Sequence, residues 1–257
     1  MEGEFDNNHR LQVDNVQWLT GLSNLQYLDM STMDLSKISD NLLQVINMIP
    51  SLVELRFSWS RLGHISHHLI QSNFSSLAIL DLSGTELSSL PRWIFGIRKL
   101  ASLNLHDNGI EGSMPEGPWN LTLLNHLYLQ ANYLNGSSLP RELFNLSNLI
   151  SLDLTENQLE DLNLNGNTCI NMTILEDLDI SSNNLHSSIP KWLYNCKHLK
   201  SLELHSNHLQ GAISDDIGNL SSIIHLGLAW NELTGRIPNK IGTLCEIKCL
   251  DLSRNKL

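Results

Sequence analysis

Several features that mark common protein classes are scarce in this chain of 257 residues. The chain has 16 Lys and Arg against 27 Asp and Glu, which gives a formal net charge of −11. No cluster of basic residues is present, so a protein that binds the phosphate backbone of nucleic acids is excluded. Aromatic residues make up only 6%, so leucine must supply most of the core volume. No apolar run approaches the roughly 18 residues of a membrane span, so direct membrane insertion is not expected.

Cysteine is equally scarce, and its spacing fits no disulfide framework of a small secreted domain. Cys196 fills a leucine position in the repeat described below, which predicts a buried thiol, while a Cys169–Cys196 disulfide is left open. Cys245 and Cys249 lie four apart near the last residue. The first residues, MEGEFDNNHRLQVDN, lack the basic and apolar segments of a secretory signal, so none is expected in this sequence.

What the chain has is a repeat of about 24 residues built around a Leu-x-Leu pair. One copy reads LGLAWNELTGRIP, from Leu226 to Pro238. An asparagine follows the second leucine of most pairs by three residues, whereas the three upstream copies have Met33, Ser60 and Thr85 there. The first leucines of the ten pairs are Leu28, Leu55, Leu80, Leu103, Leu127, Leu152, Leu178, Leu202, Leu226 and Leu250.

Each part of the repeat has a physical reason. Leu-x-Leu predicts a short strand with both leucines inward and the middle residue outward. Stacking such strands in parallel buries a leucine ladder that no single turn could bury alone. The asparagine amide both donates and accepts, so it can pair backbone groups where the chain turns inside a dry interior. In the Gly-x-Ile-Pro segment that follows, the glycine can adopt a positive φ, the isoleucine fills the core, and the proline fixes φ at about −65°.

From about Val16 onward these residues resemble the plant extracellular type of leucine-rich repeat, with consensus LxxLxxLxLxxNxLxGxIPxxLxxL. Residues 16–58 and the segments PRWIF, PRELF and PKWLY are similar to receptor-like proteins of the ethylene-inducing xylanase receptor group. The resemblance implies an α/β-type solenoid, a right-handed coil with a parallel sheet on its concave face and 3-10 or loop segments on its convex face. We expect residues 1–15 to lie outside the repeats and residues 16–257 to form one solenoid of about ten repeats.

Family members carry cysteine-flanked caps, more than twenty repeats and a membrane span, none of which this sequence shows. We therefore interpret it as a fragment, and we expect its first and last turns to expose leucines. By resemblance, the ligand binds the concave face. Trp59 and Trp230 stand out there because exposed tryptophans often anchor interfaces, although each ring could equally lie flat over a neighbouring turn. Outward strand positions are expected to line this face and to hold the candidate ligand-binding residues, which are Arg56, Trp59, His106, Asp107, Tyr128, Glu156, His205 and Trp230.

Nothing in the sequence predicts catalysis, a cofactor or a metal. An acidic series that includes Asp153 and Asp179 follows from the consensus strand, and most of its members are too far apart for a glycosidase pair. His64, His67 and His68 have no further ligand at suitable spacing. No nucleophile elbow or phosphate loop is present, so the chain is not expected to be an enzyme.

Six Asn-x-Ser/Thr sequons indicate secretory ancestry. All but Asn135 precede the same framework position of the repeat. The candidate glycosylation sites are Asn73, Asn120, Asn135, Asn145, Asn171 and Asn219.

These observations favour a ligand-recognition module of a receptor-like protein in defence or surface signalling. It would bind a microbial or endogenous protein, peptide or glycan, and signalling would pass to a co-receptor kinase. The intact family member is expected on the extracellular side of the cell membrane. A secreted inhibitor similar to plant polygalacturonase inhibitors is the alternative, because those also have ten repeats of this type.

Overall fold

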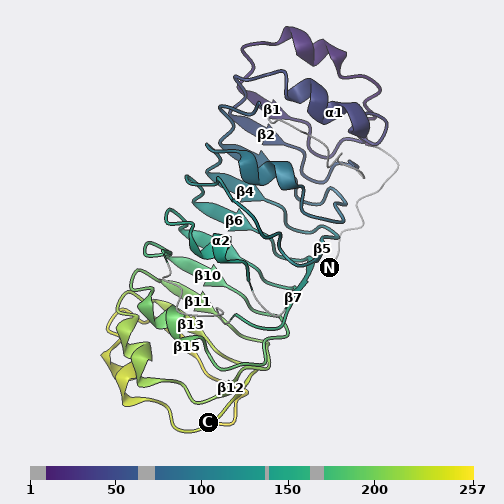
Figure 1. Cartoon of the computed structure of the whole chain (residues 1–257). Coiled ribbons are helices and arrows are strands. Elements are labelled where there is room, and N and C mark those ends of the chain that lie inside the picture. The colour runs from purple at the N-terminus through teal and green to yellow at the C-terminus, as the bar shows by residue number, and fades with distance from the viewer. Residues whose placement is uncertain (1–9, 63–72, 137–138, 163–170) are drawn as a thin grey trace.

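The computed structural model describes residues 10–62, 73–136, 139–162 and 171–257. The chain winds into an elongated stack of turns, here called rungs and numbered 1 to 10 by the first leucine of each Leu-x-Leu pair. Figure 1 shows the rungs progressing without interruption from the N-terminal part to the C-terminal part. The architecture predicted from the repeat is confirmed.

A ten-stranded parallel sheet runs along one face of the stack. Neighbouring strands pair in register, so that Leu202 of one rung lies beside Leu178 and Leu226 of the adjacent rungs. Each strand has three residues and one leucine at its centre. The strands are β1 (Tyr27–Asp29), β2 (Glu54–Arg56), β3 (Ile79–Asp81), β4 (Ser102–Asn104), β6 (His126–Tyr128), β8 (Ser151–Asp153), β10 (Asp177–Asp179), β11 (Ser201–Glu203), β13 (His225–Gly227) and β15 (Cys249–Asp251).

A second set of parallel strands, which the sequence did not lead us to expect, follows the asparagine turn. One group joins β5 (Glu111–Gly112), β7 (Tyr133–Gly136) and β9 (Gln158–Leu159), and another joins β12 (Gln210–Gly211) and β14 (Glu232–Leu233). In Figure 1 these strands follow the edge of the stack away from the ten-stranded sheet. Single bridges extend the pattern, and one of them pairs Gln12 with Asp34, so residues before Val16 also take part.

Short helical segments close most rungs on the side of the core opposite the main sheet. Proline is the residue before four of them, because its fixed φ suits an extended entry and its missing N–H is not needed there. The segments are η1 (Gln17–Gly21), α1 (Ser39–Ile46), η2 (Arg92–Gly96), α2 (Arg141–Phe144), η3 (Lys191–Asn195), η4 (Asp215–Asn219) and η5 (Asn239–Thr243). None of the helices in the part of the chain that the structure describes is long and apolar enough to span a bilayer.

The leucines of the main sheet form a continuous dry core. Leu202 and Leu226 are fully buried, whereas Leu250 in the last rung is 41% exposed. This difference confirms that each leucine is covered by the rung on either side of it, and that an end rung lacks one of its covers.

The asparagines form a second, polar ladder beneath the turns. Asn183 donates from Nδ2 to the carbonyls of Leu154, Ile180 and Ser181 at 2.9–3.2 Å, and its Oδ1 accepts the Leu159 N–H at 3.0 Å. Two of these groups belong to the preceding rung, so each amide joins two rungs. The other members are Asn108, Asn132, Asn157, Asn207, Asn231 and Asn255.

Candidate ligand-binding surface

The outward positions of the main sheet form a column of residues that starts with Asp29 and ends with Asp251, one per rung. Five of its aspartates use Oδ1 to accept the backbone N–H two residues further on, as Asp81 does from Ser83 at 3.0 Å. In Asp81 and Asp179 the same oxygen also accepts a serine hydroxyl at 2.6 Å. These carboxylates therefore hold the turn after each strand, which explains the acidic series without catalysis.

The next feature is a column of left-handed residues, here called the turn column, which lies immediately before the asparagine position. Every rung has a positive φ here, between 51° and 62°. We expected Trp59, Asp107, Glu156 and Trp230 at outward strand positions, and that was wrong, because the strands end earlier and these residues form the turn. The turn column comprises Thr32, Trp59, Gly84, Asp107, Ala131, Glu156, Ser182, Ser206, Trp230 and Arg254.

Trp59 lies over the next rung and also lines a groove. A Cβ added to Gly84 would be 2.7 Å from its indole carbons, so the ring rests on the glycine. Its ring and that of His106 meet edge to face, with centroids 6.0 Å apart. Trp59 remains 37% exposed and borders a groove of about 470 Å³ with Arg10, Glu86, Asp107 and Tyr133 among its lining residues. The ring therefore lies over the neighbouring rung, and its role as an interface anchor stays a prediction.

Arg56 belongs to a charged group beside Trp59. Its Nε is paired with Glu54, and its Nη1 is 4.0 Å from Asp81. The hydrogen bond that Arg56 Nε donates to the Glu54 carboxylate raises the pKa of Arg56, so the guanidinium stays charged at any relevant pH. This group presents one cation held between two carboxylates.

An aromatic pair lies in the middle of the surface. The rings of His126 and Tyr128 lie nearly parallel, with centroids 6.1 Å apart and an interplanar angle of 7°. Both residues are half-buried. Tyr128 therefore presents a partly exposed ring flanked by an imidazole.

The C-terminal part of the surface is acidic. A Cβ on Gly227 would lie 1.6 Å from Oε2 of Glu203, so the glutamate carboxylate occupies the space that the glycine leaves. Burial first, and the charge of Asp179 second, raise the pKa of Glu203, while His205 and His225 act in the opposite direction. Protonation of this one carboxylate is therefore easier than that of a free glutamate.

Trp230 is the most exposed tryptophan of the described residues, at 58%. The guanidinium carbon of Arg254, its neighbour in the turn column, is 4.8 Å from the ring centroid. Trp59 and Trp230 are seven rungs apart, which corresponds to about 34 Å at the usual strand spacing. The structure thus gathers Arg56, Trp59, His106 and Asp107 near one end of the surface and leaves Trp230 near the other.

The remaining predicted residues lie between these ends. Glu156 is exposed in the turn column, and His205 is half-buried with its Nδ1 3.1 Å from the Ser206 hydroxyl. Neither has an aromatic neighbour among the ring contacts described. They extend the surface but do not form a pocket with Trp59 or Trp230.

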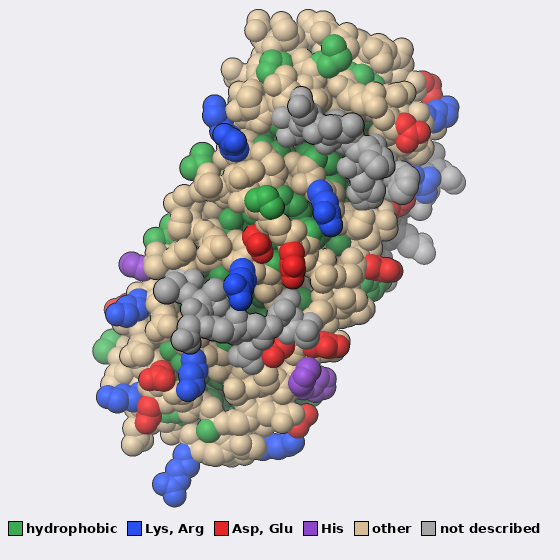
Figure 2. Space-filling model, viewed as in Figure 1, with side chains coloured by type: hydrophobic (Ala, Val, Ile, Leu, Met, Phe, Trp, Pro, Cys, Tyr) green, Lys and Arg blue, Asp and Glu red, His purple; other side chains and the backbone are tan. Residues whose placement is uncertain are grey.

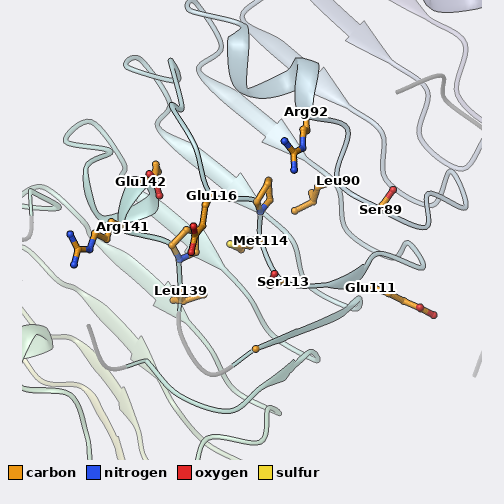
Figure 3. Close-up of a pocket in the computed structure, with 13 residues that line it drawn as sticks. Ser89, Leu90, Arg92, Glu111, Ser113, Met114, Glu116, Leu139, Arg141 and Glu142 are labelled. Carbon is orange, nitrogen blue, oxygen red and sulfur yellow. The ribbon is translucent and has the colours of Figure 1, made fainter. Parts of the chain in front are cut away.

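A separate cavity of about 910 Å³ opens on the helical side of the coil. Figure 3 shows Arg92 and Glu142 at its rim and Met114 and Leu139 deeper in it. None of the predicted ligand-binding residues lines this cavity. On the face in Figure 2, acidic and basic side chains are interspersed and form no continuous basic stripe.

The sequon asparagines are all exposed, and the framework residues that follow five of them are buried. Those five asparagines take the same place in their rungs, beside the helical segments. Asn135 instead lies in β7. A glycan on any of the six would point to solvent, so all six remain candidate sites.

The described residues contain neither a candidate metal site nor a reactive buried thiol. Residues 10–62, 73–136, 139–162 and 171–257 contain no group of three or more His, Cys, Asp or Glu that could hold a metal. His64, His67, His68 and Cys169 lie outside the described residues. Cys196 is a free, buried thiol whose pKa burial raises to about 11, which makes it unreactive.

Comparison with known proteins agrees with this geometry. The profile of the leucine rich repeat family matches residues 50–110 and 173–233. The chain therefore has the leucine-rich repeat fold. Receptor like protein 22 of Arabidopsis thaliana is 32% identical over 130 residues, which cover 51% of this chain and 16% of that relative. Receptor-like protein EIX1 of Solanum lycopersicum is also 32% identical over 130 residues, covering 48% and 12%. The resemblance to plant receptor-like proteins is confirmed, and the matched segments cover less than a fifth of these relatives.

Solved leucine-rich repeat structures superpose along nearly the whole chain. The protein LIC12759 of Leptospira interrogans has a TM-score of 0.75 at 25% identity, covering 96% of this chain and 59% of that one. The PEPR1-AtPEP1 structure has a TM-score of 0.72 at 25% identity, covering 96% and 34%. The ectodomain of the Arabidopsis thaliana receptor kinase GASSHO1/SCHENGEN3, in complex with CASPARIAN STRIP INTEGRITY FACTOR 2, has a TM-score of 0.57 at 26% identity, covering 96% and 35%.

Proposed function

We propose that this chain is the ligand-recognition part of a receptor-like protein in defence or surface signalling, and that it binds an extended peptide along its concave face. The observation that carries the proposal is the pair of distant aromatic anchors, Trp59 above its groove and Trp230 beside Arg254. The receptor-like relatives and the complexes named above support the same role.

The separation of the anchors determines the kind of ligand. About 34 Å between them exceeds the reach of a small molecule, whereas an extended peptide spans it with about ten residues at roughly 3.3 Å each. The surface between them carries carboxylates, imidazoles and one phenol, which provide polar contacts around the anchors. The rigid coil keeps this surface in place before the ligand arrives, which lowers the entropy lost on binding.

In this proposal, the intact receptor displays the coil on the outside of the cell membrane, and a co-receptor kinase transmits the signal. The sequons fit that location because glycans are added in the secretory pathway. The chain itself acts by binding and carries out no reaction.

The test is a selection of peptides from a randomised twelve-residue library displayed on phage, with the full chain as bait. Trp59→Ala and Trp230→Ala should each weaken the selected peptides at least tenfold while the melting temperature changes little. Trp18→Ala is the matched control, because Trp18 is 56% exposed but lies in η1 on the helical side. Failure to enrich any peptide, or equal losses in all three variants, would refute the proposal.

A further inference from the structure

Buried polar atoms without a hydrogen-bond partner are rare in folded proteins, and each needs an explanation. Among the described residues of this chain, such atoms occur in Ser60, Trp93, His126, Gln130 and Thr155. Ser60 and Trp93 are themselves buried within the coil. The other three lie on the concave face of two adjacent rungs, which is unexpected for a surface where polar groups usually meet solvent.

The three residues occupy two adjacent rungs. His126, Tyr128 and Gln130 alternate with inward leucines, so their side chains leave the same face of rung 5. Thr155 is the counterpart of Gln130 on rung 6, and the Ala131 N–H donates to the Thr155 carbonyl at 2.9 Å, which brings the two positions side by side. Tyr128 lies between His126 and Gln130 in the row, and its ring is parallel to the imidazole.

Thr155 also departs from a local rule. In the same position of other rungs, the hydroxyls of Ser83 and Ser181 donate to the aspartate two residues before them at 2.6 Å. Asp153 accepts the backbone N–H of Thr155, yet the Thr155 hydroxyl has no partner. The Thr155 hydroxyl is therefore left available, whereas Ser83 and Ser181 use theirs within the rung.

We propose that His126, Gln130 and Thr155 form a subsite for the main-chain amides of the ligand, which they contact once the Tyr128 ring turns aside. This inference rests on the proposed function. In an extended peptide, each residue presents its N–H and its C=O on the same edge of the chain. Its N–H suits the Gln130 carbonyl oxygen, which only accepts, and its C=O suits the Thr155 hydroxyl or a protonated imidazole nitrogen.

The subsite has a chemical character different from that of the two ends of the surface. Arg56 with its carboxylates at one end, and Glu203 with Asp179 at the other, select charged side chains. The uncharged amide of Gln130 and hydroxyl of Thr155 fix the register of the peptide main chain whatever its sequence. Tyr128 is half-buried between His126 and Gln130, so its ring has to turn before a ligand reaches these atoms.

The experiment uses the full chain and peptides selected from the twelve-residue library. Gln130→Met and Thr155→Val keep the size of each side chain but remove its partnerless atom. Each should weaken several unrelated peptides about tenfold, while the melting temperature stays the same or rises, because an unpaired polar atom has been removed. Ser60→Ala is the matched control: it removes a partnerless hydroxyl from the interior and should leave peptide affinity unchanged.

A double-mutant cycle that combines Gln130→Met with N-methylated peptides shows which peptide N–H the Gln130 side chain contacts. Methylating one peptide nitrogen at a time should reveal a position whose loss of the N–H weakens binding about tenfold. With that peptide, Gln130→Met should cost less than twofold more, because the bond it would break is already gone. If the two losses multiply at every position, or if Gln130→Met and Thr155→Val leave affinity intact, the subsite is refuted while the proposed function stands.

Two further outcomes, one of the peptide selection and one of a sugar-binding assay, also decide whether the subsite is correct. If no peptide is enriched, the proposed function fails and the subsite fails with it. If chitohexaose binds the chain and Gln130→Met abolishes that binding, the subsite recognises sugar hydroxyls, and its assignment to peptide amides is overturned.

Discussion

The asparagine ladder permits a quantitative prediction at Asn183, which is 5% exposed. In Asn183→Ala, the carbonyls of Leu154, Ile180 and Ser181 each keep a second donor: the Asn157 amide, the Asn207 amide and the Glu156 N–H, respectively. The Leu159 N–H loses its acceptor and stays buried, at a cost of about 1–3 kcal/mol. The small void left by the amide adds about 1 kcal/mol, so we expect a loss of about 2–4 kcal/mol.

Urea unfolding followed by far-UV circular dichroism measures this effect as a lower midpoint. Ser60→Ala is the comparison, because Ser60 occupies the same position of its rung and its hydroxyl has no partner. Removing that hydroxyl should leave the midpoint unchanged or raise it. If Asn183→Ala and Ser60→Ala shift the midpoint equally, the amides do not brace the rungs and the reasoning fails.

Other residues give further predictions. Gly84→Ala should lower the free energy of unfolding by about 1–3 kcal/mol, because alanine is strained at the positive φ of this position and its Cβ displaces the Trp59 ring. The fluorescence emission of tryptophan should shift as well, and an unchanged spectrum would contradict the contact. The pKa of Glu203 is raised, so the folded chain holds this proton at a pH where the unfolded chain has lost it, and stability falls as pH rises through that window. Glu203→Gln should flatten this part of a melting-temperature profile against pH, and an identical profile would refute the shift. Trp230→Gly should be more stable than Trp230→Ala by about 1 kcal/mol in thermal melts, because only glycine is free of strain at a φ of 55°, and the reverse order would contradict the left-handed turn. When the chain is expressed with a secretory signal in plant cells, enzymatic deglycosylation should lower its mass. Asn120→Gln should reduce that loss by the mass of one glycan, and a mass that the enzyme leaves unchanged would exclude glycosylation of the sequons.

Much of the candidate surface could be anticipated. The repeat phase placed Arg56 and Tyr128 on the outward side of the strands, and it placed Trp59 and Trp230 in one equivalent position. It did not show that this position is a left-handed turn, because the residues there are as different as Thr32, Trp59 and Ala131. Only one of the ten, Gly84, is a glycine that would have indicated a positive φ.

The subsite residues were also hidden from the sequence. His126 and Tyr128 could be placed on the surface, but whether an amide or a hydroxyl finds a partner depends on rotamers and on neighbours a whole rung away. Gln130 and Thr155 are 25 positions apart in the chain, and only the stacking of rungs 5 and 6 brings them side by side. The second set of parallel strands was missed for the same reason, since two-residue strands such as β5 carry no periodic pattern of their own.

The sequence by itself determined the period, the inward leucines, the bracing asparagines and hence the coil, because these depend on spacing that repeats within about 24 residues. Tertiary structure alone decided that Trp59 rests on Gly84, that Glu203 fills the space over Gly227, and that three polar atoms lack partners near Tyr128. Each of these depends on which side chain the neighbouring rung presents, and that contact exists only after the rungs have stacked.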